Sequence, residues 1–364
     1  MIIRDIDTDA HAAHEMFQSF EGMEGLPVAA PARKQLSIEG FARSVYPGLL
    51  VAITIALAAD WLAGHYKAPV MLFSLLFGMT FHFLHEEGRC VAGIEFASKA
   101  VLRTGVALLG ARITAQQIAA LGPVPIAMVV AGVTTTVLIG LLLARVLGLS
   151  RSFGTLSGGA VGICGASAAL AIASVLPKTK ESERDVILAV VVVTGLSTIA
   201  MILYPMLVTA IGLDNQRAGF FLGGTIHDVA QVVGAGYTIS QKTGDIATYV
   251  KLLRVAMLLP VVGTIALVLS RGAGGLKSAK VPLPWFLFGF AALVAMNSLG
   301  FLPKAAVDGA TDISRWCLVV AIAALGMKTS FKALIAAGWR PIAVMVLETA
   351  WIAGLVLAVV EFAT

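Results

Sequence analysis

Two segments of this 364-residue sequence place glycines and polar residues where the surrounding chain is strongly apolar. The first reads SGGAVGICGASA, from Ser157 to Ala168, and the second reads LGGTIHDVAQVVGAG, from Leu222 to Gly236. Backbone N–H and C=O groups cannot stay unpaired in lipid, so an interrupted helix is tolerated at membrane depth only where protein or water covers it. Both segments therefore predict broken backbone inside a membrane protein.

The first segment offers neutral hydrogen-bond donors that suit an anion. A helix that breaks at a glycine leaves free N–H groups at the new N-terminus, and these favour a negative charge. Serine hydroxyls add donors without adding charge, whereas the thiol of Cys164 is expected to pack as a small apolar side chain. The candidate binding residues are Ser157, Gly158, Gly159, Cys164, Gly165 and Ser167. The helix is expected to break around the glycine pair and again around Gly162 and Gly165.

The second segment adds ionisable side chains. His227 and Gln231 are four residues apart and would share one helix face, with Asp228 beside them. Ionisable residues at membrane depth are costly and mark functional sites, and histidine titrates near neutral pH, so the His-Asp pair suits a proton-coupled step. The alternative is that Asp228 caps a helix or pairs locally and that His227 forms a hydrogen bond between helices. The candidate residues are Gly223, Gly224, Thr225, His227, Asp228 and Gln231.

Other polar residues inside the predicted spans are weaker candidates. Lys99 and Arg103, one helical turn apart, would form a cationic stripe that faces a cavity, unless their side chains extend to the membrane interface. Arg254 has the same two interpretations, and Glu348 is expected to link helices by a hydrogen bond. The spacing of residues indicates no catalytic group, metal site or cofactor, and the three cysteines form no disulfide framework.

The composition predicts an all-α polytopic membrane protein of the cell inner membrane. The sequence is 58% hydrophobic and 13% charged, with a mean hydropathy of +0.91, whereas soluble domains carry about 25% charged residues. Apolar runs long enough to cross a bilayer recur, giving about nine to eleven transmembrane segments, two of them interrupted or re-entrant. We expect a polar cytoplasmic N-terminal tail over 1–44 and a single transmembrane domain over 45–361.

Nine spans and two irregular segments follow from the apolar runs. The spans are 45–64, 69–84, 91–111, 123–148, 186–211, 248–270, 283–302, 312–327 and 340–361, and the irregular segments are 153–176 and 217–238. The basic loops place the N-terminus in the cytoplasm and the C-terminus outside. Loop 177–185 carries Lys178, Lys180 and Arg184, but loop 212–217 carries only Arg217, so the charges favour re-entrant segments over crossing ones.

The sequence also contains an internal repeat. Leu109–Ala127 aligns without a gap with Leu325–Ala343, and Arg112 then corresponds to Lys328. Under the predicted topology the two copies run through the membrane in opposite directions. A shorter similarity relates the two irregular segments. Inverted repeats combined with interrupted helices are typical of secondary transporters.

The segments SGGAVGICGASAALA, GGTIHDVAQVVGAG and VLRTGVALLGARIT resemble those of the UPF0324 family, also called the YeiH or sulfate exporter family. The resemblance covers roughly residues 45–361. It implies a relation to the superfamily of bile acid, arsenite and riboflavin transporters, with inverted repeats whose interrupted helices cross near the membrane midplane. It also implies that the candidate residues of both segments form the binding site.

The leading hypothesis is a secondary transporter of a small anion, with sulfate or an organosulfonate as the cargo and a proton as the coupling ion. The sequence has no Walker-type phosphate loop, which argues against ATP drive. One alternative is a sodium- or proton-coupled cation exchanger. The least favoured alternative is an intramembrane enzyme with His227 beside a serine or cysteine nucleophile. The expected partners are the anion and the lipid bilayer, not nucleic acid, and a homodimer is left open.

Overall fold

The computed structural model describes residues 38–66, 69–86, 88–177, 179–273, 285–329 and 338–363. These residues form helices and connecting turns, and none of them is assigned to a strand. Residues 1–37 of the predicted tail lie outside the described ranges. The first described helix begins at Ile38, so residues 38–44 of the predicted tail are helical.

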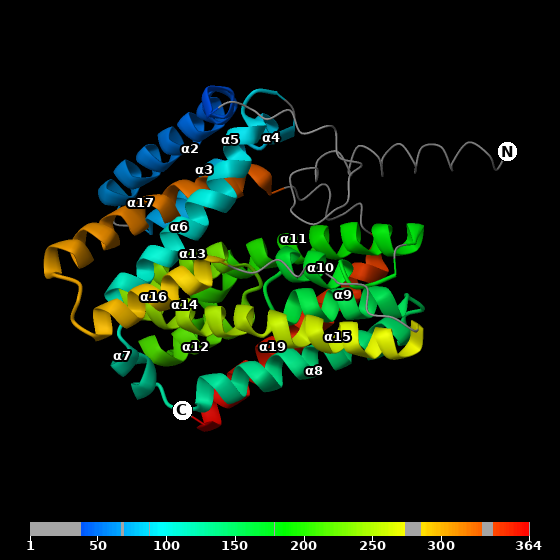
Figure 1. Ribbon diagram of the computed structural model, residues 1–364. Helices are drawn as coiled ribbons and strands as arrows, with labels where there is room; N and C mark the ends of the chain where they lie inside the picture. Colours follow the sequence, from blue (N-terminus) through cyan, green and yellow to red (C-terminus); the bar gives the residue numbers. More distant parts are fainter. Residues whose placement is uncertain are drawn as a thin grey trace.

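The helices form two bundles (Figure 1). The first bundle contains α2 (Ile38–Tyr66), α3 (Val70–Thr80), α4 (Phe83–Glu86), α5 (Val91–Phe96), the π-helical turn η1 (Ala97–Val101), α6 (Leu102–Leu109), η2 (Gly110–Arg112), α7 (Ala115–Ala120), α16 (Trp285–Ser298) and α17 (Lys304–Lys328). The second bundle contains α8 (Val124–Val146), α9 (Arg151–Gly162), α10 (Ala166–Ala173), α11 (Lys180–Ala210), α12 (Asn215–Thr225), α13 (Val229–Ile239), α14 (Gln241–Ala256), α15 (Leu258–Ala273) and α19 (Trp339–Ala363). Helix α13 packs against α3 and α17 and so joins the bundles.

Six stretches among the described residues are long and apolar enough to cross a membrane. They are α2, α8, α11, the consecutive helices α14 and α15 taken together, α17 and α19. The remaining three predicted spans correspond to α3, α5–α6 and α16, which are shorter or interrupted. The prediction of an all-α polytopic membrane protein is confirmed.

The segment α9–α10 is a re-entrant hairpin. Ser150, which caps the start of α9, donates a hydrogen bond to the carboxylate of Asp185, in the second turn of α11 (2.5 Å). Helix α10 ends at Ala173, a few residues before α11 begins. The chain therefore enters and leaves the membrane on the side where α11 starts.

The segment α12–α13 is a second re-entrant hairpin, which enters from the opposite side. Ser240, directly after α13, donates to the side chain of Asn215 at the start of α12 (2.9 Å), and Thr243 donates to the backbone of Asn215 (3.2 Å). The crossing helix α11 separates the entry points of the two hairpins. The alternative that the loop charges favoured, two re-entrant segments, is the one that the structure has.

We call the side on which α2 begins the N-side and the side on which α19 ends the C-side. Three crossings, α2, α3 and α5–α6, bring the chain to α7 on the C-side, and α8 returns it to the N-side. The α9–α10 hairpin therefore enters from the N-side and the α12–α13 hairpin from the C-side.

Asp214 caps the start of α12. Its carboxylate accepts a hydrogen bond from the backbone N–H of Arg217, and this hydrogen bond lowers the pKa of Asp214.

The helices that lead into and out of the two copies of the repeat run antiparallel, as the predicted topology requires. In the first bundle, Glu95 pairs with Lys328 (2.7 Å), and Ser314 of α17 donates to the carbonyl of Gly105 in α6 (2.6 Å), so rising numbers along α5–α6 meet falling numbers along α17. In the second bundle, α8 and α19 are antiparallel in the same way, and Trp351 donates to Thr135 (3.1 Å). Residues 330–337 of the second copy lie outside the described residues.

Close packing of α3 and α17 supplies a test of this fold. A Cβ added at Gly326 would overlap the carbonyl oxygen of Leu75, whereas a Cβ at Gly309 of the same helix would meet nothing within 4 Å. We expect Gly326→Ala to lower stability by about 1–3 kcal/mol, because the helices must move apart. Gly309→Ala should leave stability unchanged or raise it, because alanine favours helix. Thermal unfolding in detergent measures both, and equal stabilities would contradict the packing.

Candidate functional site

The tips of the two hairpins meet at membrane depth. The helices of each hairpin are separated by three residues, Ile163–Gly165 in the first hairpin and Ile226–Asp228 in the second. We call these two breaks the hairpin tips. A Cβ built on Gly165 would lie 3.6 Å from the carbonyl oxygen of His227, so the tips are in contact. Their residues correspond one to one, and Gly165 is the counterpart of Asp228.

Lys251 of α14 binds both tips at once. Its Nζ donates to the carbonyl oxygen of Ile163 (2.7 Å) and to that of Ile226 (3.0 Å). These carbonyls end α9 and α12, where the helix dipole leaves negative partial charge and unpaired acceptors. The fully buried ammonium group therefore stabilises the ends of two half-helices whose last carbonyl groups have no partner within their own helix.

Arg254, one turn further along α14, makes a parallel set of contacts. Its guanidinium donates to carbonyl oxygens at the end of α9 and at the end of α12, and the side chain is buried. The acceptors are Val161 (2.6 Å), Gly162 (2.9 Å), Gly223 (3.2 Å) and Ile226 (3.0 Å). A buried cation is tolerated only when its donors are paired, and here the paired donors hold the two tips together.

The N-termini that follow the tips differ from each other. Asp228 caps α13, and its carboxylate accepts the backbone N–H of Ala230 (2.8 Å). Gly165, at the same position before α10, has a φ of 68° and no side chain that could cap the helix. Ser167 is exposed in the first turn of α10. The positive end of α13 is thus already occupied by a carboxylate, whereas no side chain caps the positive end of α10.

The glycine pair of the first hairpin does not break the helix, contrary to the prediction. Helix α9 continues through Gly158 and Gly159 to Gly162. A Cβ at Gly158 would lie 2.7 Å from the backbone of Val137 in α8, and one at Gly159 would overlap the side chain of Ile172. The pair therefore permits close helix packing, which is the usual role of small residues between membrane helices. Cys164 is buried within the tip.

Gly223, Gly224 and Thr225 have a similar packing role in the second hairpin. A Cβ at Gly223 would overlap the backbone of α14, and one at Gly224 would lie 3.0 Å from Val356 of α19. The hydroxyl of Thr225 donates to the carbonyl of Phe221 in its own helix (2.6 Å). These three residues position the tip rather than face an open surface.

His227 is fully buried in the second tip. Its Nε2 lies 3.0 Å from the hydroxyl of Thr349 in α19, and that hydroxyl donates to the carbonyl of Met345 (2.7 Å). The hydroxyl of Thr349 therefore accepts from Nε2–H, while Nδ1 is buried without a partner. The imidazole is paired with Thr349 and not with Cys164 or Ser167, the pairing that an enzyme would need.

Gln231 and Asp228 are held by the long helix α11. The side-chain amide of Gln231 donates to Thr198 (2.9 Å), and the backbone N–H of Asp228 donates to the hydroxyl of Ser197 (3.0 Å). The oxygen Oε1 of Gln231 is buried without a partner. Two neighbouring hydroxyls of α11 thus fix the orientation of the second tip.

Ser157, from the first hairpin, is also buried. Its hydroxyl donates to the carboxyl oxygen Oε1 of Glu348 in α19 (2.7 Å). This contact agrees with the expectation that Glu348 links helices by a hydrogen bond. Neighbouring residues of α19, Glu348 and Thr349, therefore contact different hairpins.

Of the three additional basic candidates, only Arg254 lies at the tips. Lys99 pairs with Glu95 in the first bundle (2.9 Å), and Glu95 also pairs with Lys328. Arg103 is exposed on α6. Groups of three or more His, Cys, Asp or Glu that could hold a metal ion do not occur among the described residues.

Sequence reasoning missed Lys251, which contacts both tips. The predicted span began at residue 248 and put Lys251 near the membrane edge, where a lysine is unremarkable. In the structure α14 begins at Gln241, so Lys251 lies within the membrane-crossing stretch 241–268. The signal that could have found it is the pair Lys251 and Arg254, which share one helix face at a spacing of three residues.

The fold and the site define an all-α polytopic membrane protein with two re-entrant hairpins. The family model described as "Conserved hypothetical protein 698" matches residues 47–345. The chain belongs to this family, whose curated members are called UPF0324 membrane proteins. The predicted family resemblance is confirmed.

Curated relatives match over most of their length. A UPF0324 membrane protein of Chlorobaculum tepidum is 55% identical over 86% of this chain and 88% of its own. The protein named UPF0324 membrane protein TauZ of Paracoccus pantotrophus is 50% identical over 88% of this chain and 96% of its own. A UPF0324 membrane protein of Rhizobium meliloti is 48% identical over 91% of this chain and 97% of its own. No solved structure matches the chain.

The contacts of Lys251 lead to a stability prediction. Lys251→Met would leave the carbonyl group of Ile163 without its donor, whereas that of Ile226 would keep Arg254, and an unsatisfied buried polar group costs about 1–3 kcal/mol. We expect a corresponding loss of stability on thermal unfolding in detergent. Lys242→Met is the matched control, because Lys242 is exposed in the first turn of the same helix. If the two variants unfold alike, Lys251 does not hold the tips.

Proposed function

We propose that this protein is a secondary transporter that moves a small anion across the membrane by alternating access. The observation that carries the proposal is the meeting of two re-entrant hairpin tips at membrane depth, one of which precedes a helix N-terminus that no side chain caps. Irregular backbone at this depth is tolerated where it lines a path for solutes, and half-helix N-termini bind anionic groups in transporters.

The charge at the tips favours an anion over a cation. Lys251 and Arg254 bring two buried positive charges, and Asp228 brings one carboxylate. The carbonyl groups that could hold a sodium ion, those that end α9 and α12, already accept hydrogen bonds from Lys251 and Arg254. This supports the anion carrier over the cation exchanger that the sequence left as an alternative.

We propose sulfate or an organosulfonate as the cargo. Its oxygens would accept hydrogen bonds from the backbone N–H groups in the first turn of α10 and from the hydroxyl of Ser167. The resemblance to sulfate exporters supports this class of anion, and relatives from Paracoccus carry the name TauZ. We propose a proton rather than sodium as the coupling ion, and the inner membrane as the location, with the basic N-side in the cytoplasm.

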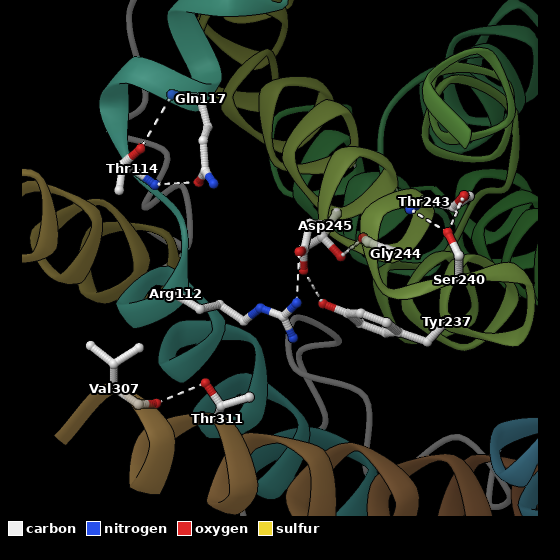
Figure 2. A network of polar contacts seen from close by, with 11 residues as sticks. Arg112, Thr114, Gln117, Tyr237, Ser240, Thr243, Gly244, Asp245, Val307 and Thr311 are labelled. Carbon is white, nitrogen blue, oxygen red and sulfur yellow. Dashed lines mark hydrogen bonds and ion pairs between the residues drawn. The ribbon is translucent and has the colours of Figure 1, made fainter. Parts of the chain in front are cut away.

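The two bundles supply the moving parts, and an ion pair connects them on the C-side of the tips (Figure 2). Arg112, from η2 of the first bundle, donates to Oδ2 of Asp245 in α14 (2.8 Å), and Tyr237 of α13 donates to Oδ1 of the same carboxylate (2.6 Å). Asp245 lies in the second turn of α14, close to its C-side end. We infer that this three-residue contact, the C-side gate, closes the path from the tips to the C-side.

The cargo proposal predicts a specific effect at Ser167. In proteoliposomes we expect uptake of labelled sulfate that is driven by a pH gradient and independent of sodium. Ser167→Leu should abolish uptake, because it blocks the open N-terminus of α10. Ser174→Leu is the control, since Ser174 is exposed beyond the other end of the same helix. Wild-type vesicles that take up no sulfate would remove sulfate as cargo, and sodium dependence would favour the cation exchanger.

The C-side gate predicts a change in access. Asp245→Asn removes the charge that pairs with Arg112, and a charged hydrogen bond of this kind contributes about 1.5–3 kcal/mol. We expect a cysteine at position 167 to react with a membrane-impermeant thiol reagent several-fold faster from the C-side in this variant, in a background without native cysteines. Asp60→Asn is the control, because Asp60 pairs with Arg315 inside the first bundle. Equal labelling rates in the two variants would contradict the gate.

A further inference from the structure

We propose that Glu348 is the group that binds and releases the coupling proton. The inference deepens the proposed function and rests on it. Glu348 lies in the middle of α19, is fully buried, and is used neither by the tips nor by the C-side gate.

The carboxyl group of Glu348 has one polar contact. Its Oε1 lies 2.7 Å from the hydroxyl of Ser157 in α9, and its Oε2 is buried without a partner. A Cβ added at Gly140 of α8 would overlap Oε1, so the glycine at that position makes room for the carboxyl group. The carboxyl thus occupies a fitted space between α8, α9 and α19.

The helices packed against α19 are α8, α9, α11 and α12, and none of the cations that they carry contacts Glu348 in the described structure. Most of their charged residues lie in end turns, namely Arg145, Arg151, Glu181, Glu183, Arg184, Asp185 and Arg217. Of the other titratable groups near α19, Tyr204 of α11 packs against Phe221, and His227 of the second tip hydrogen-bonds to Thr349. The charged residues of α19 itself, Arg340 and Glu361, lie at its two ends, and the donors of Lys251 and Arg254 bind the tips.

These surroundings make ionisation of Glu348 conditional on a conformational change. A buried carboxylate with no cation beside it is costly, whereas a neutral carboxylic acid costs far less. In the acid form, the 2.7 Å contact can run from the carboxyl O–H to the Ser157 hydroxyl, which then donates to the carbonyl of Gly154 (3.4 Å). Release of the proton to water breaks this arrangement and requires that water or a cation reach the carboxylate.

The position of Glu348 links its proton to both hairpins. Glu348 contacts the first hairpin through Ser157, and the next residue, Thr349, contacts the second tip through His227. A proton added to His227 would instead put a third positive charge beside Lys251 and Arg254, both of which bind the carbonyl of the preceding residue, Ile226. The geometry therefore favours Glu348 over His227 as the proton carrier.

Infrared spectroscopy tests the protonation of Glu348 without any transported substrate. In the purified wild type we expect a carboxylic-acid C=O band from a buried acid, lost in Glu348→Gln and shifted in Ser157→Ala. Glu361→Gln is the matched control, because Glu361 is exposed near the end of the same helix, and this variant should keep the band. The proposal is overturned if Glu348→Gln removes no band, or if the band does not titrate with pH.

Transport in proteoliposomes tests the coupling. With labelled sulfate, Glu348→Gln should retain sulfate-for-sulfate exchange and lose the response to a pH gradient, while Glu361→Gln retains both. A gradient response in Glu348→Gln equal to that of the wild type overturns the proposal but leaves the transporter intact. Wild-type sulfate uptake with no gradient response overturns proton coupling itself. Absence of any sulfate uptake counts against the proposed cargo, and the infrared titration then decides whether Glu348 exchanges its proton.

Discussion

The pairing of carbonyl groups at the ends of α9 and α12 is the constraint on which the rest of the structure depends. Each half-helix ends inside the membrane, where water cannot pair its last carbonyls. Lys251 and Arg254 pair them from a single helix, and both residues bind both hairpins. Because α14 supplies both cations, the hairpins are held in one fixed relation to each other and to the second bundle. Motion between the bundles can then carry the tips as a unit.

The same pairing creates the chemical difference between the two tips. With the carbonyl ends neutralised by cations, the charge that remains to be satisfied lies at the N-termini of α10 and α13. Asp228 provides an internal anion for α13, and Gly165 provides none for α10. The two tips therefore differ in charge at this pair of corresponding positions. That asymmetry supports the proposal that an anion from outside the protein binds at the first tip.

Much of this architecture could be predicted from the sequence. The two glycine-rich segments marked the hairpins, the aligned repeat marked antiparallel copies, and the uneven loop charges favoured re-entrant segments. Gly158 and Gly159 were misread because glycine permits both a break and a close helix contact, and only the position of Val137 distinguishes the two. Lys251 was missed because the predicted span started too late. The pair of Arg112 with Asp245 joins residues 133 positions apart, and no local pattern encodes such a contact.

The capping of the first hairpin by α14 has a consequence for biosynthesis. The carbonyl of Ile163 finds its donor 88 residues later in the chain, and that of Gly162 finds its donor 92 residues later. When α9 and α10 leave the ribosome, neither Lys251 nor Arg254 has been made. The first hairpin must therefore wait at the membrane surface, or beside water in the insertion machinery, until α14 is synthesised. Its entry into the bilayer is then a late assembly step that the second half of the chain controls.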